Sequence, residues 1–182
     1  MKGFNRQNQL LSLCGLNCGL CPMNLDKHCP GCGGGNGNQS CKIAKCSLEH
    51  GKPEYCCDCK NYPCETFDKI DLYDSFITHQ RQKADLQRVV DIGIDKYNAE
   101  QAEKMEILNT LLSNYNDGRK KTFYCVAVNL LELSEVKHVI RQIADAKDLE
   151  RLSLKEKSAF VVELFQQIAK EKNIKLKLLK KK

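Results

Sequence analysis

The residues of this chain best suited to chemistry are its cysteines. Eleven of the twelve lie between Cys14 and Cys64. Thiols at this density either pair as disulfides or bind metal ions as thiolates. The segment contains three C-x2-C units, Cys18–Cys21, Cys29–Cys32 and Cys56–Cys59. Such a unit lets a tight turn present two sulfurs to one ion, so three within about forty residues predict closed tetrahedral zinc sites.

The start of the chain bears on the choice between disulfides and metal. Residues Met1–Leu13 contain neither the apolar run of about seven or more residues nor the small-residue cleavage site of an export signal. No stretch approaches the roughly 18 apolar residues of a membrane span. We therefore expect a cytoplasmic protein, in which a reducing environment disfavours disulfides and favours metal ligation.

The number of cysteines limits how many four-cysteine metal sites the chain can form. Two four-cysteine sites use eight of the eleven clustered thiols, whereas three would need all twelve, including the distant Cys125, or a histidine ligand. His28 and His50 lie within the segment and are the candidates for that role. The expected cofactor is therefore zinc, at about two ions per chain. Spacing leaves open which cysteine joins which site.

An iron–sulfur cluster is the competing interpretation. Cys14, Cys18 and Cys21 form a C-x3-C-x2-C run, the spacing used by radical enzymes that bind a four-iron cluster. Those enzymes need a large β/α barrel, and no alternation of strands and helices follows here. A plain iron–sulfur protein in electron transfer or sensing stays open, because the same residue type binds both metals.

After Cys64 the apolar residues are spaced with the periodicity of helices. Apolar residues recur every three or four positions around Asp85–Lys96, from Asn98 to Asn116, and again from Phe123 to Leu131. We expect a mainly α fold, in which a loop-rich, metal-stapled segment (residues 1–66) packs on a helical domain (residues 67–182) of four to six helices.

The remaining elements are predicted from local signals. One helix is expected to start after Ser134, and a capping box of Ser153 and Glu156 is expected to open the last one. The alternation in Ile174–Leu178 favours a short strand. Cys125 lies about 200° around its helix from Phe123, away from the apolar stripe, which favours a surface or interface thiol.

The cysteine segment itself has little material for a core. Residues 1–64 contain seven leucines and few other large apolar side chains. Metal binding, at about 10–16 kcal/mol per structural zinc, is expected to replace that core. Chelation is therefore expected to unfold the segment.

The charge of the chain and its lack of catalytic motifs indicate which partners and activities are expected. The formal charge is +6, and seven lysines lie in residues 170–182. A nucleic-acid-binding zinc protein is a further alternative, although the cysteine segment lacks the interleaved Arg and aromatic residues that such binding uses. No catalytic motif is present, and an all-cysteine ligand set is typical of closed structural sites. The sequence therefore favours a structural or interaction module over an enzyme; it does not identify a partner, for which another protein is the candidate.

The cysteine segment resembles a known family over residues Leu13–Phe67. The similarity lies in the opening Cys14-Gly-Leu-Asn-Cys-Gly-Leu-Cys-Pro22, the knuckle Cys29-Pro-Gly-Cys32, the middle pair Cys41 and Cys46, and the closing run Tyr55–Glu65. These features resemble the cysteine-rich prokaryotic family called domain of unknown function 3795. The resemblance implies zinc binding, a prokaryotic cytoplasmic source and no assigned reaction. Cys57 is an addition to the family pattern. The ligands that the resemblance implies are Cys14, Cys18, Cys21, Cys29, Cys32, Cys41, Cys46, Cys56, Cys59 and Cys64.

Overall fold

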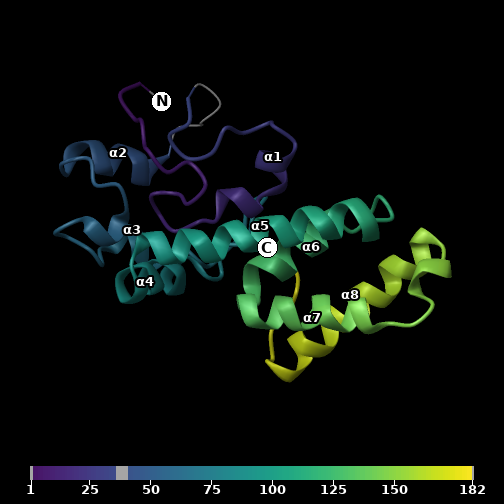
Figure 1. Ribbon diagram of the computed structural model, residues 1–182. Coiled ribbons are helices and arrows are strands. Elements are labelled where there is room, and N and C mark those ends of the chain that lie inside the picture. The colour runs from purple at the N-terminus through teal and green to yellow at the C-terminus, as the bar shows by residue number, and fades with distance from the viewer. Residues whose placement is uncertain (1, 36–40, 182) are drawn as a thin grey trace. The chain divides into compact units, whose positions relative to one another are not determined.

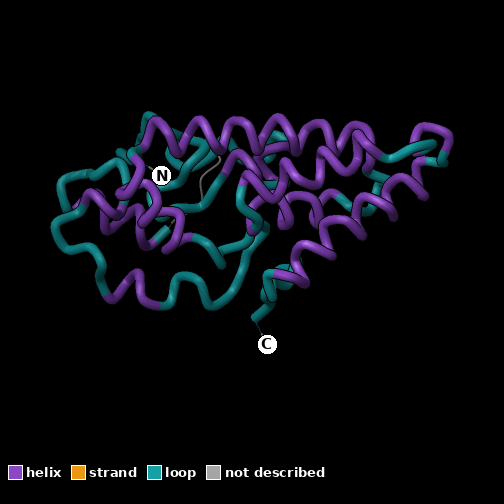
Figure 2. The backbone as a smooth tube through the Cα atoms, turned by 60° about the horizontal axis from the view of Figure 1, so that its bottom comes forward, coloured by secondary structure: helices purple, strands orange, loops and turns teal. Residues whose placement is uncertain are grey.

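The fold of the protein, taken from a computed structural model that describes residues 2–35 and 41–181, is mainly helical (Figure 1). Within these ranges no strand occurs (Figure 2), and the only β pairing is an isolated bridge between Leu11 and Asn17. The expected mainly α class is confirmed. None of the helices in the described ranges has the length and apolar character needed to cross a bilayer.

The cysteine segment holds short elements joined by loops, because its glycines, prolines and knuckles interrupt helical runs. Its elements are η1 (Cys18–Leu20), α1 (Pro22–Leu25), α2 (Lys42–Glu49), η2 (Cys56–Asp58) and α3 (Glu65–Asp68).

The rest of the chain forms longer helices, as its periodicity predicts. They are α4 (Gln82–Ile92), α5 (Ile94–Tyr115), α6 (Lys121–Leu130), α7 (Leu133–Asp145), η3 (Leu149–Arg151) and α8 (Leu154–Glu171).

Two predicted helix boundaries were wrong. The helix expected over Asp85–Lys96 breaks at Gly93, whose φ of 83° ends α4, and the residues after it begin α5. α7 begins at Leu133, before Ser134, because Glu132 caps it and its backbone N–H donates to the Glu135 carboxylate at 2.8 Å.

The capping box predicted for the last helix is confirmed. The Glu156 backbone N–H donates to Ser153 Oγ at 3.4 Å, and the Ser153 N–H donates to Glu156 Oε2 at 2.9 Å. The strand predicted over Ile174–Leu178 is wrong, since residues 2–35 and 41–181 contain no strand with which it could pair. Instead, Leu179 N–H donates to Asp74 Oδ2 at 2.6 Å, and Leu179 O accepts from Asp74 N–H at 2.8 Å.

The chain folds into two compact units, Met1–Gln101 with Leu178–Lys182, and Ala102–Lys177. The sequence placed a boundary between residues 66 and 67, whereas α4 and the start of α5 fold with the cysteine segment. The reason is a shared core, in which apolar side chains of both regions are buried together. That core consists of Leu11, Tyr55, Phe67, Leu86, Val89 and Tyr97.

The second unit is built around α6. All residues from Tyr124 to Leu130 are buried, and the rings of Tyr124 and Phe165 pack edge to face with centroids 6.2 Å apart. Cys125 is only 3% exposed, so the expected surface thiol was wrong. Periodicity predicts an exposed Cys125 only if a single stripe of the helix is buried, whereas α6 is enclosed on nearly every side.

Candidate metal centre

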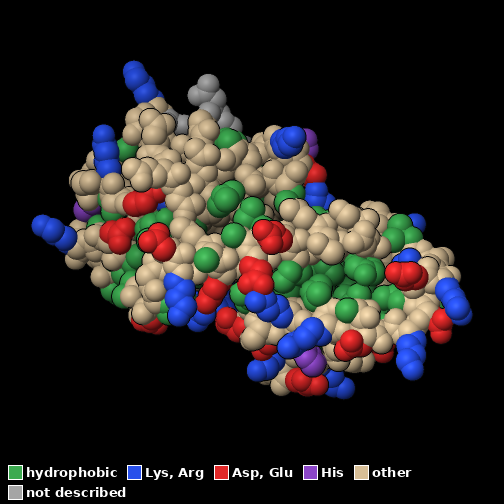
Figure 3. Space-filling view, in the orientation of Figure 1, with side chains coloured by type: hydrophobic (Ala, Val, Ile, Leu, Met, Phe, Trp, Pro, Cys, Tyr) green, Lys and Arg blue, Asp and Glu red, His purple; other side chains and the backbone are tan. Residues whose placement is uncertain are grey.

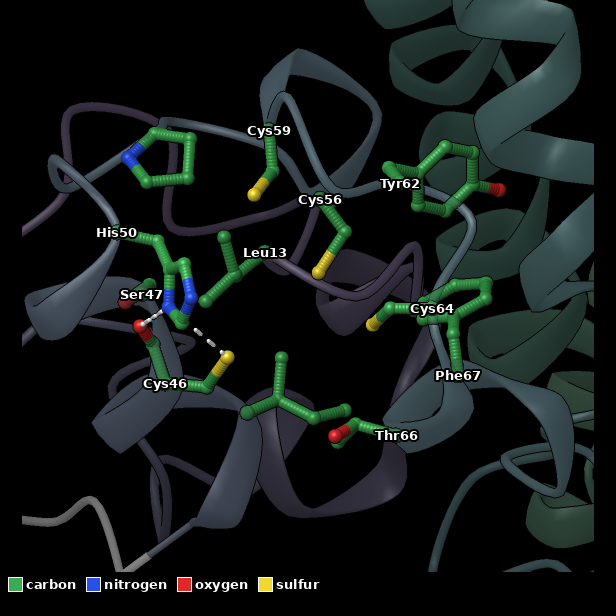
Figure 4. A pocket seen from close by; sticks show the side chains of 12 residues that line it. Leu13, Cys46, Ser47, His50, Cys56, Cys59, Tyr62, Cys64, Thr66 and Phe67 are labelled. Atoms are coloured by element: carbon green, nitrogen blue, oxygen red, sulfur yellow. Dashed lines mark hydrogen bonds between the residues drawn. The ribbon is translucent and has the colours of Figure 1, made fainter.

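Four of the predicted ligands line one small cavity in the first unit. Cys46 comes from α2, Cys56 and Cys59 from the two ends of η2, and Cys64 from the residue before α3. We call these four residues the first cluster. The cavity has a volume of about 30 Å³, which is of the order of one bound water or ion. In Figure 4 the four sulfur atoms lie around the cavity, with the Leu13 side chain among them.

Local sequence explains how Cys56 and Cys59 come to lie together. The C-x2-C unit forms one tight 3-10 turn, in which the Cys59 N–H donates to Cys56 O at 3.1 Å. Asp58 caps this turn, since its Oδ2 accepts from the Tyr55 N–H at 3.0 Å. Spacing predicted this pair, whereas the approach of Cys46 and Cys64 depends on the tertiary fold.

His50 contacts the first cluster from the end of α2. Its Nδ1 lies 2.8 Å from Cys46 O and 3.5 Å from Cys46 Sγ (Figure 4). A carbonyl oxygen only accepts, so this bond requires the proton on Nδ1. His50 is thus a neighbour of the sulfur ligands, and His28, the other candidate, is exposed.

An open depression of about 490 Å³ adjoins this cavity. The two share His50, Pro53 and Cys59, and the depression is also lined by Asp58 and Lys60. Solvent therefore reaches the first cluster from the side of Cys59.

The electrostatics of the first cluster favour a cation. Burial raises the pKa of Cys56 far above its usual range, and the nearby thiols of Cys14 and Cys64 raise it further. The pKa of Cys46 is likewise raised, by burial and then by Cys64 and Cys59. Burial and neighbouring negative charge both disfavour the thiolate forms of Cys46 and Cys56. A divalent metal ion supplies a compensating positive charge and stabilises the thiolate forms.

A second group of thiols surrounds Cys14. Burial raises its pKa to about 11, and Cys32 and Cys41 contribute to the increase. Burial raises the pKa of Cys18 to about 12, with Cys32, Cys14 and Cys21 as its charged neighbours in decreasing order of effect. Cys14 therefore lies within electrostatic range of Cys18, Cys32 and Cys41, and also of Cys56 in the first cluster.

Three further cysteines are neighbours of these thiols, since Cys21 adds to the raised pKa of Cys18 and Cys57 adds to that of Cys56. Burial raises the pKa of Cys21, and Cys29 is the thiol that adds to the shift, so these two form a neighbouring pair. Cys57 does not line the cavity. Burial and then Asp58 raise its pKa to about 11.

The side chains as placed do not form a closed coordination sphere. Across residues 2–35 and 41–181, no three His, Cys, Asp or Glu side chains are gathered tightly enough to hold a metal ion.

Two polar contacts of Cys14 were missed by sequence reasoning. Gln82 Nε2, on α4, donates to Cys14 Sγ at 3.1 Å and to Cys14 O at 3.1 Å. Ser12 Oγ lies 3.2 Å from the same sulfur. Ser12 lies next to the C-x3-C run, so its proximity could have been noticed. Gln82 lies 68 residues away, and no sequence signal connects it to Cys14.

Comparison of the chain with protein-family models, curated proteins and solved structures gave no match. The resemblance to domain of unknown function 3795 therefore stays a prediction that rests on the cysteines quoted above.

Proposed function

We propose that this protein binds zinc through its N-terminal cysteines and acts as a structural or interaction module rather than as an enzyme. The observation that supports this most is the first cluster. Three separate elements bring four sulfurs to one cavity of ionic size, and local spacing accounts for only one pair of them. Four thiolates are the donor set of closed, tetrahedral structural zinc sites.

The small apolar core around the cluster supports a structural role for the metal. Next to the C-x2-C turn, the buried apolar residues of one core cluster are only Phe4, Leu13 and Ala44. Cys32 and Cys56 pack against them as partly buried side chains. Metal ligation beside this small core would add folding free energy directly.

The proposed setting is the cytoplasm, and the proposed partner is another protein. On the face that Figure 3 shows, Lys and Arg side chains are interspersed with Asp and Glu rather than gathered in one basic stripe. Zinc held by four thiolates carries a net charge of about −2, so two sites would also lower the formal charge of +6. Both points disfavour nucleic acid as the partner.

The first test is the metal content of untagged protein purified anaerobically without added metal. We expect about two zinc ions per chain by plasma mass spectrometry and a colourless solution. Iron with sulfide and a broad visible absorption band would replace this proposal by the iron–sulfur alternative. Protein that contains neither metal and does not take up added zinc would contradict both.

A matched pair of variants then tests the first cluster. The double variant Cys46→Ser with Cys59→Ser is expected to lose one zinc ion per chain. Cys57→Ser is the control, because Cys57 is adjacent in sequence but does not line the cavity. Retention of all zinc in the double variant, or an equal loss in the control, would contradict the assignment.

A further inference from the structure

A buried arginine contacts the chain just before the turn that carries two residues of the first cluster. The Arg6 side chain is 2% exposed, although arginine is rarely buried this fully. Its guanidinium donates to the Glu54 carbonyl oxygen through Nε at 3.0 Å and through Nη2 at 2.7 Å. Glu54 lies two residues before Cys56. Arg6 therefore fixes the backbone at the entrance to the Cys56–Cys59 turn.

The side chains of Glu54 and Tyr55 add to this contact. Glu54 Oε1 lies 3.3 Å from Arg6 Nη2, and it also accepts the Asn8 N–H at 2.9 Å. The guanidinium carbon of Arg6 lies 5.2 Å from the centroid of the Tyr55 ring, within the range of a cation–π contact. The Tyr55 N–H in turn donates to Asp58 Oδ2, inside the turn itself. Both residues that precede the turn are thus held by one guanidinium.

The same guanidinium is anchored on the N-terminal segment. Its Nη1 donates to Leu11 O at 2.8 Å and lies 3.5 Å from Cys32 O. Gly33 has a φ of 82°, and a Cβ at this position would lie 2.9 Å from both Arg6 N and Arg6 Cβ. Only glycine permits this close approach. Arg6 therefore contacts the C-x2-C turn that ends at Cys32 as well as the chain that leads into Cys56.

These contacts use features that lysine lacks. Nitrogens of one planar group reach carbonyl oxygens in three segments of the chain, and the rigid fork loses little side-chain entropy for each bond. The guanidinium also carries a positive charge, whereas zinc held by four thiolates carries about −2 in total. Outer contacts of this kind orient metal ligands and raise metal affinity. Arg6 is therefore suited to support a metal site.

We infer that Arg6 is a positioning residue of the first cluster, which ties the Cys56–Cys59 turn to the N-terminal segment in the geometry that presents two sulfurs to one metal ion. Arg6 acts through the backbone and is not itself a ligand. This inference rests on the proposed function, because it requires a metal ion at the first cluster.

Metal affinity tests this role. Arg6→Met keeps an unbranched apolar stem and removes the guanidinium. About 10- to 100-fold weaker binding of the first-cluster zinc is expected in competition with a chelator. Arg88→Met is the matched control, since Arg88 donates to the Glu100 carboxylate through Nε at 3.0 Å and Nη2 at 2.8 Å within the same compact unit. The control is expected to leave the zinc affinity unchanged. Equal affinities in the two variants would refute the inference.

A second readout separates positioning from a general loss of stability. Co²⁺ in place of zinc reports ligand geometry through its visible spectrum. The part due to the first cluster is the difference from the double variant Cys46→Ser with Cys59→Ser. Arg6→Lys keeps the charge but not the planar fork, so a changed first-cluster spectrum is expected while α4 keeps its amide-exchange protection.

Arg6→Lys also decides the question if Arg6→Met does not fold. A first-cluster spectrum and zinc affinity equal to those of wild type would overturn the positioning role of the planar fork. Loss of α4 protection to the same extent as zinc affinity would also overturn it, because the effect would then be one of overall stability. A wild-type chain that takes up neither zinc nor Co²⁺ would instead refute the proposed function, and the inference with it.

Discussion

Tyr97 joins α5 to the loop that carries Cys14 and Cys18, and its hydroxyl offers a quantitative test of that connection. The side chain is fully buried, and its OH donates to Asn17 Oδ1 at 2.9 Å. Asn17 Nδ2 in turn donates to Asp85 Oδ2 at 3.0 Å. Tyr97→Phe removes one buried donor and keeps the ring. Loss of a buried hydrogen bond of this kind is expected to lower the free energy of unfolding by about 1–3 kcal/mol.

The assay is urea unfolding followed by far-ultraviolet circular dichroism at a fixed zinc concentration, because bound metal shifts apparent stability. Tyr73→Phe is the matched control, since Tyr73 is 47% exposed and the same oxygen is removed there. An exposed change of this kind is expected to stay within about 0.5 kcal/mol of wild type. If Tyr97→Phe also stayed within that range, the network would not stabilise the fold as argued.

Four further predictions concern the metal and the helices. Removal of zinc by a chelator is expected to abolish amide-exchange protection in residues 41–64 while α8 keeps its protection; unchanged exchange in metal-free protein would contradict the structural role of zinc. Leu131→Ala, at a position with 0% exposure, is expected to cost about 2–5 kcal/mol in urea unfolding, whereas Leu154→Ala, at 48% exposure, should cost far less; similar costs would count against the described core. Ser153→Ala is expected to cost about 1 kcal/mol through loss of the α8 cap, and a neutral effect would argue against that cap. Hydrogen bonds from the Ser153 side chain and backbone lower the pKa of Glu156. The Glu156 carboxylate therefore stabilises the fold above its unfolded pKa, and this stabilisation is lost as the pH falls through its folded pKa. Acid unfolding of wild type and of Glu156→Gln checks this sign, and identical acid profiles would contradict it.

Much of the helical part was predictable because its signals are local. The helix that ends before Asn116 and the capping box of α8 depend on residues within a few positions of each other. The C-x2-C turn at Cys29–Cys32 is also local, and its Gly31 has a positive φ of 92°, which glycine adopts without a steric penalty. A Cβ at Gly31 would also collide with the carbonyl oxygen of Gln9, which the sequence did not indicate.

The errors arose where burial depends on distant residues. Cys125 seemed to face solvent because periodicity counts only one helix, whereas packing of other helices decides how much of α6 is enclosed. Alternation in Ile174–Leu178 predicted a strand, but a strand needs a partner, and none is present among the described residues.

The sequence alone determined the chemical character of the candidate site, because residue type and close spacing decide which atoms can bind a metal and which turns present them. It also determined the mainly helical class, through periodicity along single segments. Only the tertiary structure decided that Cys46 and Cys64 approach the Cys56–Cys59 turn, and that Gln82 reaches Cys14. The physical reason is that these approaches depend on the packing of a core shared by residues far apart in the chain, and spacing carries no information about such contacts.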